Sequence, residues 1–304
     1  MIEIQENIMS PDEIARIAQL AFVLEPIANK PGLTTRYSDK NRNLKLENFL
    51  VAGINIGDAF RELAERVYKC KELPITYDIA LQAQKDSFKN RIGSRVVYGG
   101  IIGLFPIIIT QLRIKSNKPY EVLDNVENIL KQTHKEDVLY YQELEYSAWS
   151  HFLINQKYTY DMKEDCDNIF DYLKKDLSEI NNSPVLPKQY SPKLNLKYNQ
   201  STDWVDSLDE LTWDTPLKQI KNSRPKSGSL NKEIIDGYPI VRSMLDIFYS
   251  NVKKGKYLGI SETLEEIDYL IKREFPNIYP AHVAELQTCF LYLVITYDNK
   301  EFFV

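Results

Sequence analysis

Residues able to bind a phosphorylated ligand gather near the amino end of the chain, between Glu25 and Leu50. Within this stretch, Lys30-Pro31-Gly32 predicts a sharp, stiff turn, because proline fixes φ and glycine allows positive φ. The charged side chains in and after the turn are Lys30, Arg36, Asp39, Lys40 and Arg42. A phosphate site is one interpretation of this stretch, and a solvated surface loop is the other.

Few other patterns in the chain carry recognisable chemistry. The three cysteines, at 70, 166 and 289, are far apart and show no Cys-x-x-Cys spacing, which predicts neither a zinc site nor a disulfide framework. His134 and His151 have no partner ligands at helical spacing, so capping or core roles are expected for both. The sequence has no glycine-rich phosphate loop and therefore supports neither a Rossmann fold nor a P-loop enzyme.

Apolar residues recur at helical spacing along most of the chain, and this pattern predicts the elements that must position the polar stretch. Ser10 and Glu13 predict a capped helix start, Pro119 another, and Asn231 a third, with Pro239 expected to kink the helix that follows. The expected helices cover residues 11–25, 45–67, 77–91, 96–112 (as one buried helix or a pair), 119–130, 135–154, 161–180, 231–248, 261–271 and 280–297. Strand signals are scarce. The predicted fold class is all-α.

A single helical domain of residues 1–304, similar to a helix bundle, is expected. Between residues 181 and 202 the helical period is lost and prolines are frequent, which predicts a long irregular connection. Lobes of residues 1–180 and 203–304 would then share one cleft.

Composition limits the classes of function. The 304 residues are 43% hydrophobic and 27% charged, with a net charge of −5, which is typical of a globular protein and argues against a general nucleic-acid binder. The acidic amino terminus and the unpaired cysteines predict a cytoplasmic protein. The longest apolar run, Val96–Leu112, is about one turn short of a membrane span and contains glycines and a proline, so no membrane partner is expected. Homo-oligomerisation is left open.

Two blocks of the amino-terminal half resemble the triphosphoribosyl-dephospho-CoA synthases. The first resembles the family's Pro-Lys-Pro-Gly motif and the helix after it, and consists of Lys30-Pro31-Gly32-Leu33, Arg36-Tyr37, Asp39 and Glu47-Asn48-Phe49-Leu50. The second is similar to Asn-Thr-Asn-Leu-Gly followed by an apolar helix with a proline. Aligned on Pro106, it keeps Gly99 but has Arg95, Val96 and Val97 where the family has Asn-Thr-Asn.

A third block of resemblance lies near the carboxyl end. Asp268-Tyr269-Leu270-Ile271-Lys272-Arg273-Glu274 is similar to the family's Asp-x-Leu-Ile-x-Arg-Lys, except at its last position. In Tyr279–Leu286, which resembles Asn-Pro-Gly-Thr-Thr-Ala-Asp-Leu, Glu285 keeps a carboxylate at the family's aspartate position.

The resemblance implies a transferase that uses ATP as a ribosyl donor. The 2′-hydroxyl of dephospho-CoA, or of a related nucleotide, attacks the anomeric carbon, adenine leaves and the triphosphate stays attached. The resemblance further implies that Lys30, Gly32, Arg36 and Arg273 bind the phosphates. Asp39, Asp268 and Glu285 would be the acid–base carboxylates, and Asp268 and Glu285 would hold Mg²⁺.

Other interpretations stay open at this point. Each of these carboxylates could be an ordinary helix-surface charge, and Glu285 could simply favour the dipole at the start of its own helix. Loss of the Asn-Thr-Asn signature favours a catalytically degenerate relative that binds a nucleotide or a partner. A purely structural helical scaffold is a third alternative, suggested by the aromatic content.

Overall fold

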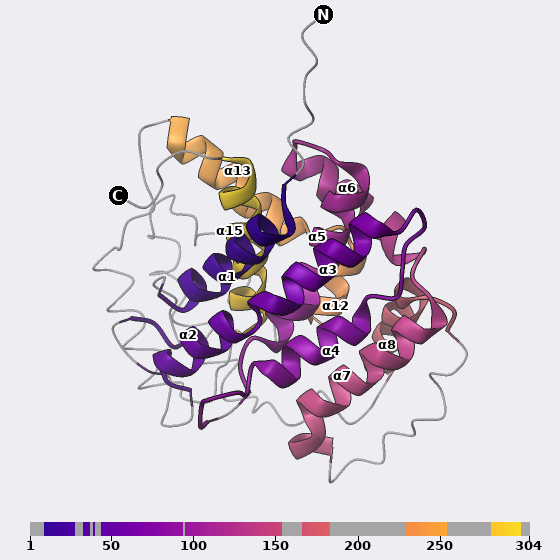
Figure 1. Ribbon diagram of the computed structural model, residues 1–304, viewed down its shortest axis with the longest axis horizontal. Helices are drawn as coiled ribbons and strands as arrows, with labels where there is room; N and C mark the ends of the chain where they lie inside the picture. The colour runs from indigo at the N-terminus through magenta and orange to yellow at the C-terminus, as the bar shows by residue number, and fades with distance from the viewer. Residues whose placement is uncertain are drawn as a thin grey trace, which may run out of the picture.

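The computed structural model describes residues 9–27, 33–36, 39, 44–93, 95–153, 166–182, 229–253 and 281–298, which are almost entirely helical (Figure 1). The helices are α1 (Pro11–Ile27), α2 (Leu46–Asn55), α3 (Gly57–Lys69), α4 (Tyr77–Asp86), α5 (Tyr98–Ile114), α6 (Pro119–Leu130), α7 (Lys135–Leu153), α8 (Ile169–Asn182), α12 (Ser229–Ile235), α13 (Pro239–Lys253) and α15 (Ala281–Tyr297). None of these ranges forms a β-strand, so the predicted all-α class is confirmed. The described helices include none that is both long and apolar enough to cross a membrane.

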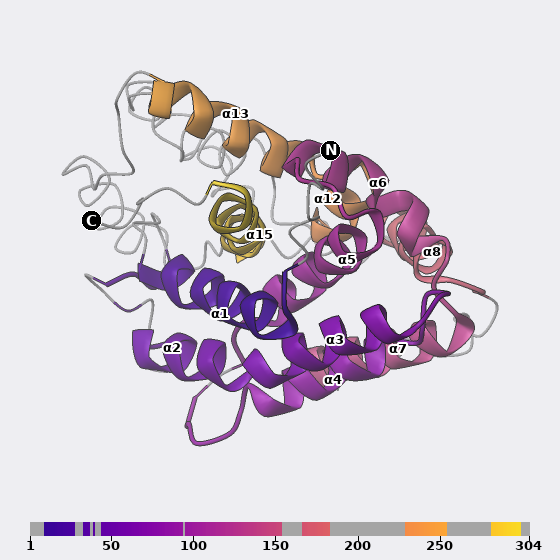
Figure 2. The ribbon, with the colours of Figure 1, turned by 45° about the horizontal axis from the view of Figure 1, so that its top comes forward.

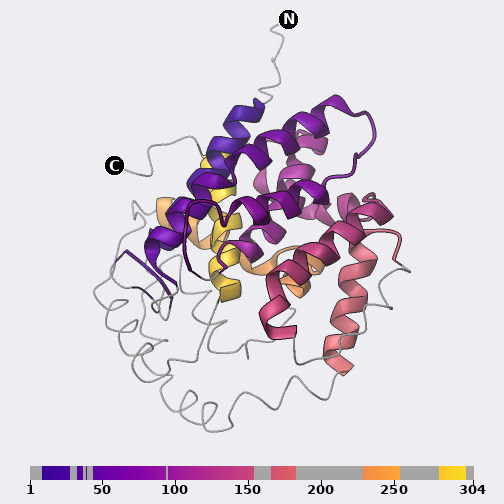
Figure 3. The same ribbon diagram turned by 60° about the horizontal axis from the view of Figure 1, so that its bottom comes forward.

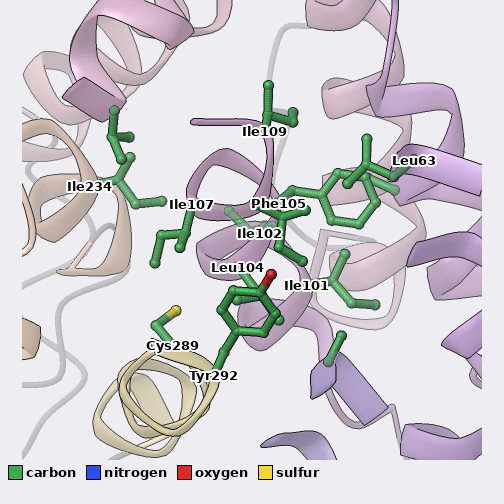
Figure 4. Packing of buried hydrophobic residues seen from close by; sticks show 14 of the residues in the cluster. Leu63, Ile101, Ile102, Leu104, Phe105, Ile107, Ile109, Ile234, Cys289 and Tyr292 are labelled. Atoms are coloured by element: carbon green, nitrogen blue, oxygen red, sulfur yellow. The ribbon is translucent and has the colours of Figure 1, made fainter. Parts of the chain in front are cut away.

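Helix α5 lies at the centre of the hydrophobic core. Every residue from Gly99 to Leu112 is buried, which confirms the buried helix predicted from the apolar run. Helices α3, α6 and α15 all pack against α5. Figure 4 shows Cys289 and Tyr292 of α15 directed toward it, and the Tyr292 hydroxyl donates a 2.7 Å hydrogen bond to Oε1 of Gln111.

Close packing around the first half of α5 depends on its glycines. A Cβ atom at Gly103 would lie 2.9 Å from Sγ of Cys289, and one at Gly100 would lie 2.6 Å from the Phe22 ring of α1. Such distances are shorter than real contacts of a Cβ atom, so larger residues at these positions would push α15 and α1 away. The glycines therefore bring three helices together at the amino end of α5.

The carboxyl-terminal helices share one core with the amino-terminal ones. Helix α15 lies between α1 and α13, as Figure 2 shows with α15 nearly end-on. Helices α7 and α8 form the opposite end of the molecule from α1 and α2 (Figure 3). The buried residues of α1, α5, α13 and α15 belong to a single hydrophobic cluster. The long connection expected at 181–202 lies outside the described residues, apart from the last turn of α8.

The start of α1 has the capping geometry that its sequence predicts. The Ser10 hydroxyl accepts a 3.2 Å hydrogen bond from the backbone N–H of Glu13, while the Glu13 carboxylate accepts one of 2.9 Å from the backbone N–H of Ser10. Each satisfies a backbone donor that has no partner within the helix. Both halves of the predicted capping box are confirmed.

The single helix predicted over 45–67 is wrong, because the structure divides it into α2 and α3 at Ile56. The Gln19 amide of α1 donates a 2.7 Å hydrogen bond to the Ile54 carbonyl, so a carbonyl near the break gains a partner. A Cβ at Gly57 would lie only 2.2 Å from Nε2 of Gln19. A side chain from another helix thus stabilises a break that local periodicity does not reveal.

The helix predicted over 231–248 is also two helices. Gly237 and Tyr238 have φ of 79° and 57°, and these left-handed residues separate α12 from α13. Pro239 is the first residue of α13 and does not kink the interior of a helix as predicted. At this position the backbone N–H that proline lacks would have no partner within the helix. Asn231 lies within α12 instead of capping it, and its amide donates to Asp176 at 2.9 Å.

Several other helix boundaries differ from the predictions: α1 continues through Pro26 to Ile27 rather than ending at 25, and α13 ends at Lys253 rather than at 248. Helix α4 ends at Asp86 rather than near 91, and α8 begins at Ile169 rather than at 161. His134 has the expected structural role: its Nε2 is 2.6 Å from the Leu73 carbonyl, and its backbone N–H donates to the buried Asp137 at 2.9 Å. The side chain of His151 lies outside the described residues.

Candidate functional site

The candidate site lies where α15 meets the amino end of α5. Glu285 reaches across to Gly99, and a Cβ atom at Gly99 would lie 1.9 Å from Cδ and 2.0 Å from Oε1 of Glu285. Only a glycine at position 99 therefore lets this carboxyl group lie directly on the backbone of the first turn of α5. Glu285 is the fifth residue of α15, which places it beyond the first turn of its own helix.

Burial and two charged neighbours set the ionisation of Glu285. Desolvation raises its pKa to about 7, the positive charge of Arg95 acts to lower the pKa, and the negative charge of Glu25 acts to raise it further. No hydrogen bond between described residues contributes to this balance. A carboxyl group with a pKa near 7 can give or take a proton at neutral pH, as a general acid or base must.

Glu25 supplies a second carboxylate from the end of α1. It is only 6% exposed and lies next to Pro26 near the end of the helix. Buried glutamates are rare in proteins unless they are paired or functional. Because the charge of Glu25 acts on Glu285, the site contains two carboxyl groups contributed by helices that are far apart in the sequence.

Arg95 is the cation of the site. Its guanidinium carbon lies 5.2 Å from the centre of the Tyr98 ring, and the charge of Glu285 acts on it across the site. Burial lowers the pKa of Arg95, but an arginine remains protonated at any physiological pH. The site therefore combines two carboxyl groups, one guanidinium and one tyrosine ring.

The backbone before α5 is strained at Val97. Val97 precedes the first residue of α5 and has φ of 62°, in the left-handed region that a β-branched side chain rarely adopts. Holding such a residue there costs on the order of 1–2 kcal/mol. Asparagine is tolerated in this conformation, and asparagine is what the resemblance places at position 97. An asparagine at position 97 would hold this backbone geometry with less strain.

The polar stretch after α1 has a partly structural role. The Asp39 carboxylate accepts a 2.8 Å hydrogen bond from the backbone N–H of Leu46, at the start of α2. Thr34 is buried and donates a 2.5 Å hydrogen bond to the Leu44 carbonyl, while Arg36 is exposed. These contacts fold the described part of the stretch back onto the start of α2.

Of the residues predicted to form the site, the structure describes Glu285, Asp39 and Arg36. Lys30, Gly32, Asp268 and Arg273 lie outside the described residues, so their predicted roles stay predictions. The sequence analysis did not assign Glu25, Arg95 or Tyr98 to the site. A glutamate on the apolar side of α1 was the available signal for Glu25. For Arg95 the signal was its alignment with the first asparagine of the family's Asn-Thr-Asn signature, whereas Tyr98 gave none beyond its nearness to Gly99.

The predicted Mg²⁺ can be tested only against part of its proposed ligands, since Asp268 is not described. Within the described ranges, no three His, Cys, Asp or Glu side chains lie close enough together to hold a metal ion. Mg²⁺ commonly takes only one or two protein carboxylates and completes its shell with phosphate oxygens and water. The pair of Glu25 and Glu285 fits that more limited requirement.

Comparison with known protein families gives one match. A family model described as ATP:dephospho-CoA triphosphoribosyl transferase (CitG) matches residues 11–169 of the 304, which is more than half of the chain. The matched region runs from α1 to the start of α8 and includes Glu25, Arg95 and Gly99, but not Glu285. No curated protein and no solved structure shows a significant match to the chain.

Proposed function

The chain belongs to the ATP:dephospho-CoA triphosphoribosyl transferase family, and from this premise we propose that it transfers the triphosphoribosyl group of ATP to the 2′-hydroxyl of dephospho-CoA or a related nucleotide. The observation that carries the proposal is the Glu285 carboxyl group, which is held against Gly99 beside Glu25 and Arg95. This arrangement supplies the residue types that the reaction needs at the meeting point of three elements.

The reaction exchanges one bond at the anomeric carbon for another. The bond between that carbon and N9 of adenine breaks, and its electron pair leaves with the base. The 2′-oxygen of the acceptor forms the new bond and loses its proton, and adenine takes up a proton. Positive charge develops on the ribose as the base departs, and a fixed carboxylate beside the sugar stabilises that charge.

The two glutamates can divide this work. Burial holds the pKa of Glu285 near 7, so its ionised form is suited to accept the proton of the acceptor hydroxyl. Glu25 is buried near it and would stabilise the positive charge on the ribose. Asp268 and Asp39 remain predicted participants, and Lys30, Gly32, Arg36 and Arg273 remain predicted phosphate ligands. The resemblance also assigns Glu285 to Mg²⁺, but a carboxylate that holds the ion cannot accept the proton, so a bound Mg²⁺ would be held by Asp268 with Glu25 and would neutralise charge on the triphosphate.

Release of adenine is the direct test of this proposal. Protein, ATP, Mg²⁺ and dephospho-CoA are incubated together, and adenine is measured by chromatography. We expect adenine to form only when an acceptor nucleotide is present, and Glu285→Gln to slow its release strongly. Wild-type protein that releases no adenine with any acceptor nucleotide would contradict the proposal.

A second candidate function is nucleotide binding without transfer. Val96 is buried and Val97 is strained, both at positions where the resemblance places ligand-facing polar side chains. Such a protein would be stabilised by ATP or dephospho-CoA, because a ligand that binds only the folded state raises the melting temperature. It would release no adenine. Melting curves with each nucleotide, followed by the adenine assay, separate the two functions.

A further inference from the structure

The segment between α4 and α5 contains two arginines in similar local settings. The guanidinium carbon of Arg91 lies 4.7 Å from the centre of the Phe88 ring, and that of Arg95 lies 5.2 Å from the centre of the Tyr98 ring. Both residues are half-buried, and burial lowers the pKa of each. Because the two arginines differ mainly in their polar neighbours, Arg91 can serve as a control for Arg95.

Arg91 serves the loop itself. Its Nε donates a 2.5 Å hydrogen bond to the backbone carbonyl of Ser87, four residues earlier. This contact and the stacking on Phe88 stabilise the turn that ends α4. Burial lowers the pKa of Arg91.

Arg95 faces the candidate site instead. The charge of Glu285 acts to raise the pKa of Arg95, and Glu285 lies against Gly99 in the first turn of α5. The guanidinium and the amino end of α5 therefore lie around the same carboxyl group. Helix α5 has 17 residues, and its N-cap residue is Val97, whose side chain makes no capping hydrogen bond.

We propose that Arg95 binds a phosphate group of the nucleotide substrate beside the amino end of α5. This inference rests on the proposed function for the identity of the ligand, a nucleoside triphosphate. An arginine offers two parallel N–H donors that match phosphate oxygens, and its charge persists when it is half-buried. Helix amino ends favour anions through their unpaired N–H groups and partial positive charge.

A phosphate group bound at this site would need a nearby positive charge, because two glutamates lie close to it. Glu25 and Glu285 would repel a phosphate group, and Arg95 with the helix end supplies the opposing charge. Stacking on Tyr98 limits the motion of the guanidinium, so less conformational entropy is lost when a ligand binds. Arg95 thus acts as a binding residue that is particular to this chain, since the resemblance gives an amide at this position.

Binding measurements with three probes test the proposal. Isothermal titration calorimetry compares inorganic tripolyphosphate, ATP and adenosine on the full chain and on the variants Arg95→Met and Arg91→Met. We expect Arg95→Met to weaken ATP and tripolyphosphate binding by about 10- to 100-fold, the usual effect of losing a charged hydrogen bond. Adenosine binding should not change, and Arg91→Met should leave all three affinities unaltered.

Two kinds of result would overturn the proposal. One is unchanged tripolyphosphate binding in Arg95→Met, or no polyphosphate binding by the wild-type chain. The other is an equal loss of adenosine binding, which would mean that Arg95 only maintains the structure. If Arg95→Met does not fold, Arg95→Lys replaces it, because lysine keeps the charge but loses the paired donors. The proposal then requires Arg95→Lys to weaken ATP binding more than adenosine binding.

The same experiment distinguishes this inference from the proposed function. Arg95-dependent ATP binding without adenine release would leave the phosphate assignment standing and remove the transferase activity. Adenine release by Arg95→Met with an unchanged KM for ATP would remove the phosphate assignment and leave the transferase activity standing.

Discussion

Two carboxyl groups in this protein, the buried Glu233 and the half-buried Glu285, have the same raised pKa but very different surroundings. Burial raises the pKa of Glu285, on α15, and of Glu233, on α12, to about 7 in both cases. Glu233 accepts hydrogen bonds from the backbone N–H groups of Ile240 and Val241, in the first turn of α13. Glu285 has no such donors among the described residues and instead faces Arg95 and Glu25.

The difference separates a structural carboxyl group from one available for chemistry. Glu233 joins α12 to α13 by capping the second helix, and its burial is compensated by the hydrogen bonds it accepts. For Glu285, no hydrogen bond within the described part of the chain offsets the cost of desolvation, which is typical of functional sites, where stability is given up for activity. A shifted pKa alone would not have distinguished the two groups.

The largest expected effect is the loss of catalysis on removing the acid–base group. Glu285→Gln should lower the rate of adenine release by about 10²- to 10⁴-fold, the usual contribution of a positioned acid or base. Glu233→Gln should keep most of the activity, because its role is structural. Single-turnover adenine release measures both variants, and equal losses would break the distinction between the two groups.

The free energy of unfolding should depend on pH through the titration of both Glu233 and Glu285. Each folded-state pKa, near 7, lies above the ordinary value of 4.5, so each contribution is fully present below pH 4.5 and is lost as the pH rises through 7. The difference corresponds to about 3 kcal/mol per group. Urea unfolding between pH 4.5 and 7.5 should show this fall.

Glutamine variants provide the control for the pH experiment. Glutamine does not titrate, so Glu233→Gln and Glu285→Gln should each flatten the slope by a similar amount. A slope that neither substitution changes would show that other groups are responsible for the pH dependence.

At a fixed pH, substituting Glu233 should cost more stability than substituting Glu285, whereas the loss of activity should be larger for Glu285. Glu233→Ala removes the acceptor for two buried N–H groups at the start of α13 and should cost about 2 kcal/mol of unfolding free energy. Glu285→Ala removes no hydrogen bond of the described part of the chain and should change the free energy by less than about 1 kcal/mol. Chemical denaturation compares them, and a larger loss for Glu285→Ala would contradict the assignment.

The smallest expected effect concerns the strained residue beside Glu285. Val97→Asn should relieve the left-handed strain and raise the unfolding free energy by about 0.5–1 kcal/mol after some lost packing. Val96→Asn, at the buried neighbouring position, should destabilise the protein because it buries an amide. Thermal unfolding of both variants tests this contrast, and stabilisation by neither would show that Val97 carries no recoverable strain.

Local rules predicted most of the helices because the interactions that form them are local. The capping box at Ser10 and Glu13, the proline at the start of α6 and the apolar run of α5 all involve residues within a few positions of one another. Where a helix boundary depends on another helix, prediction failed. The break between α2 and α3 is stabilised by Gln19 of α1, which no pattern within residues 45–67 could indicate.

The sequence by itself determined the helical class, the family and the kinds of polar residue available for phosphate and sugar chemistry. Tertiary structure decided which of them meet: Glu285 lies on Gly99 and opposite Arg95, and Glu25 is buried beside them, whereas the predicted carboxylate Asp39 caps α2. Helical periodicity is set by hydrogen bonds four residues apart. The approach of Glu285 to Arg95 is set by how helices that are distant in the chain pack together. Here the packing depends on Gly99, which is small enough to let the Glu285 carboxyl group contact the backbone of α5.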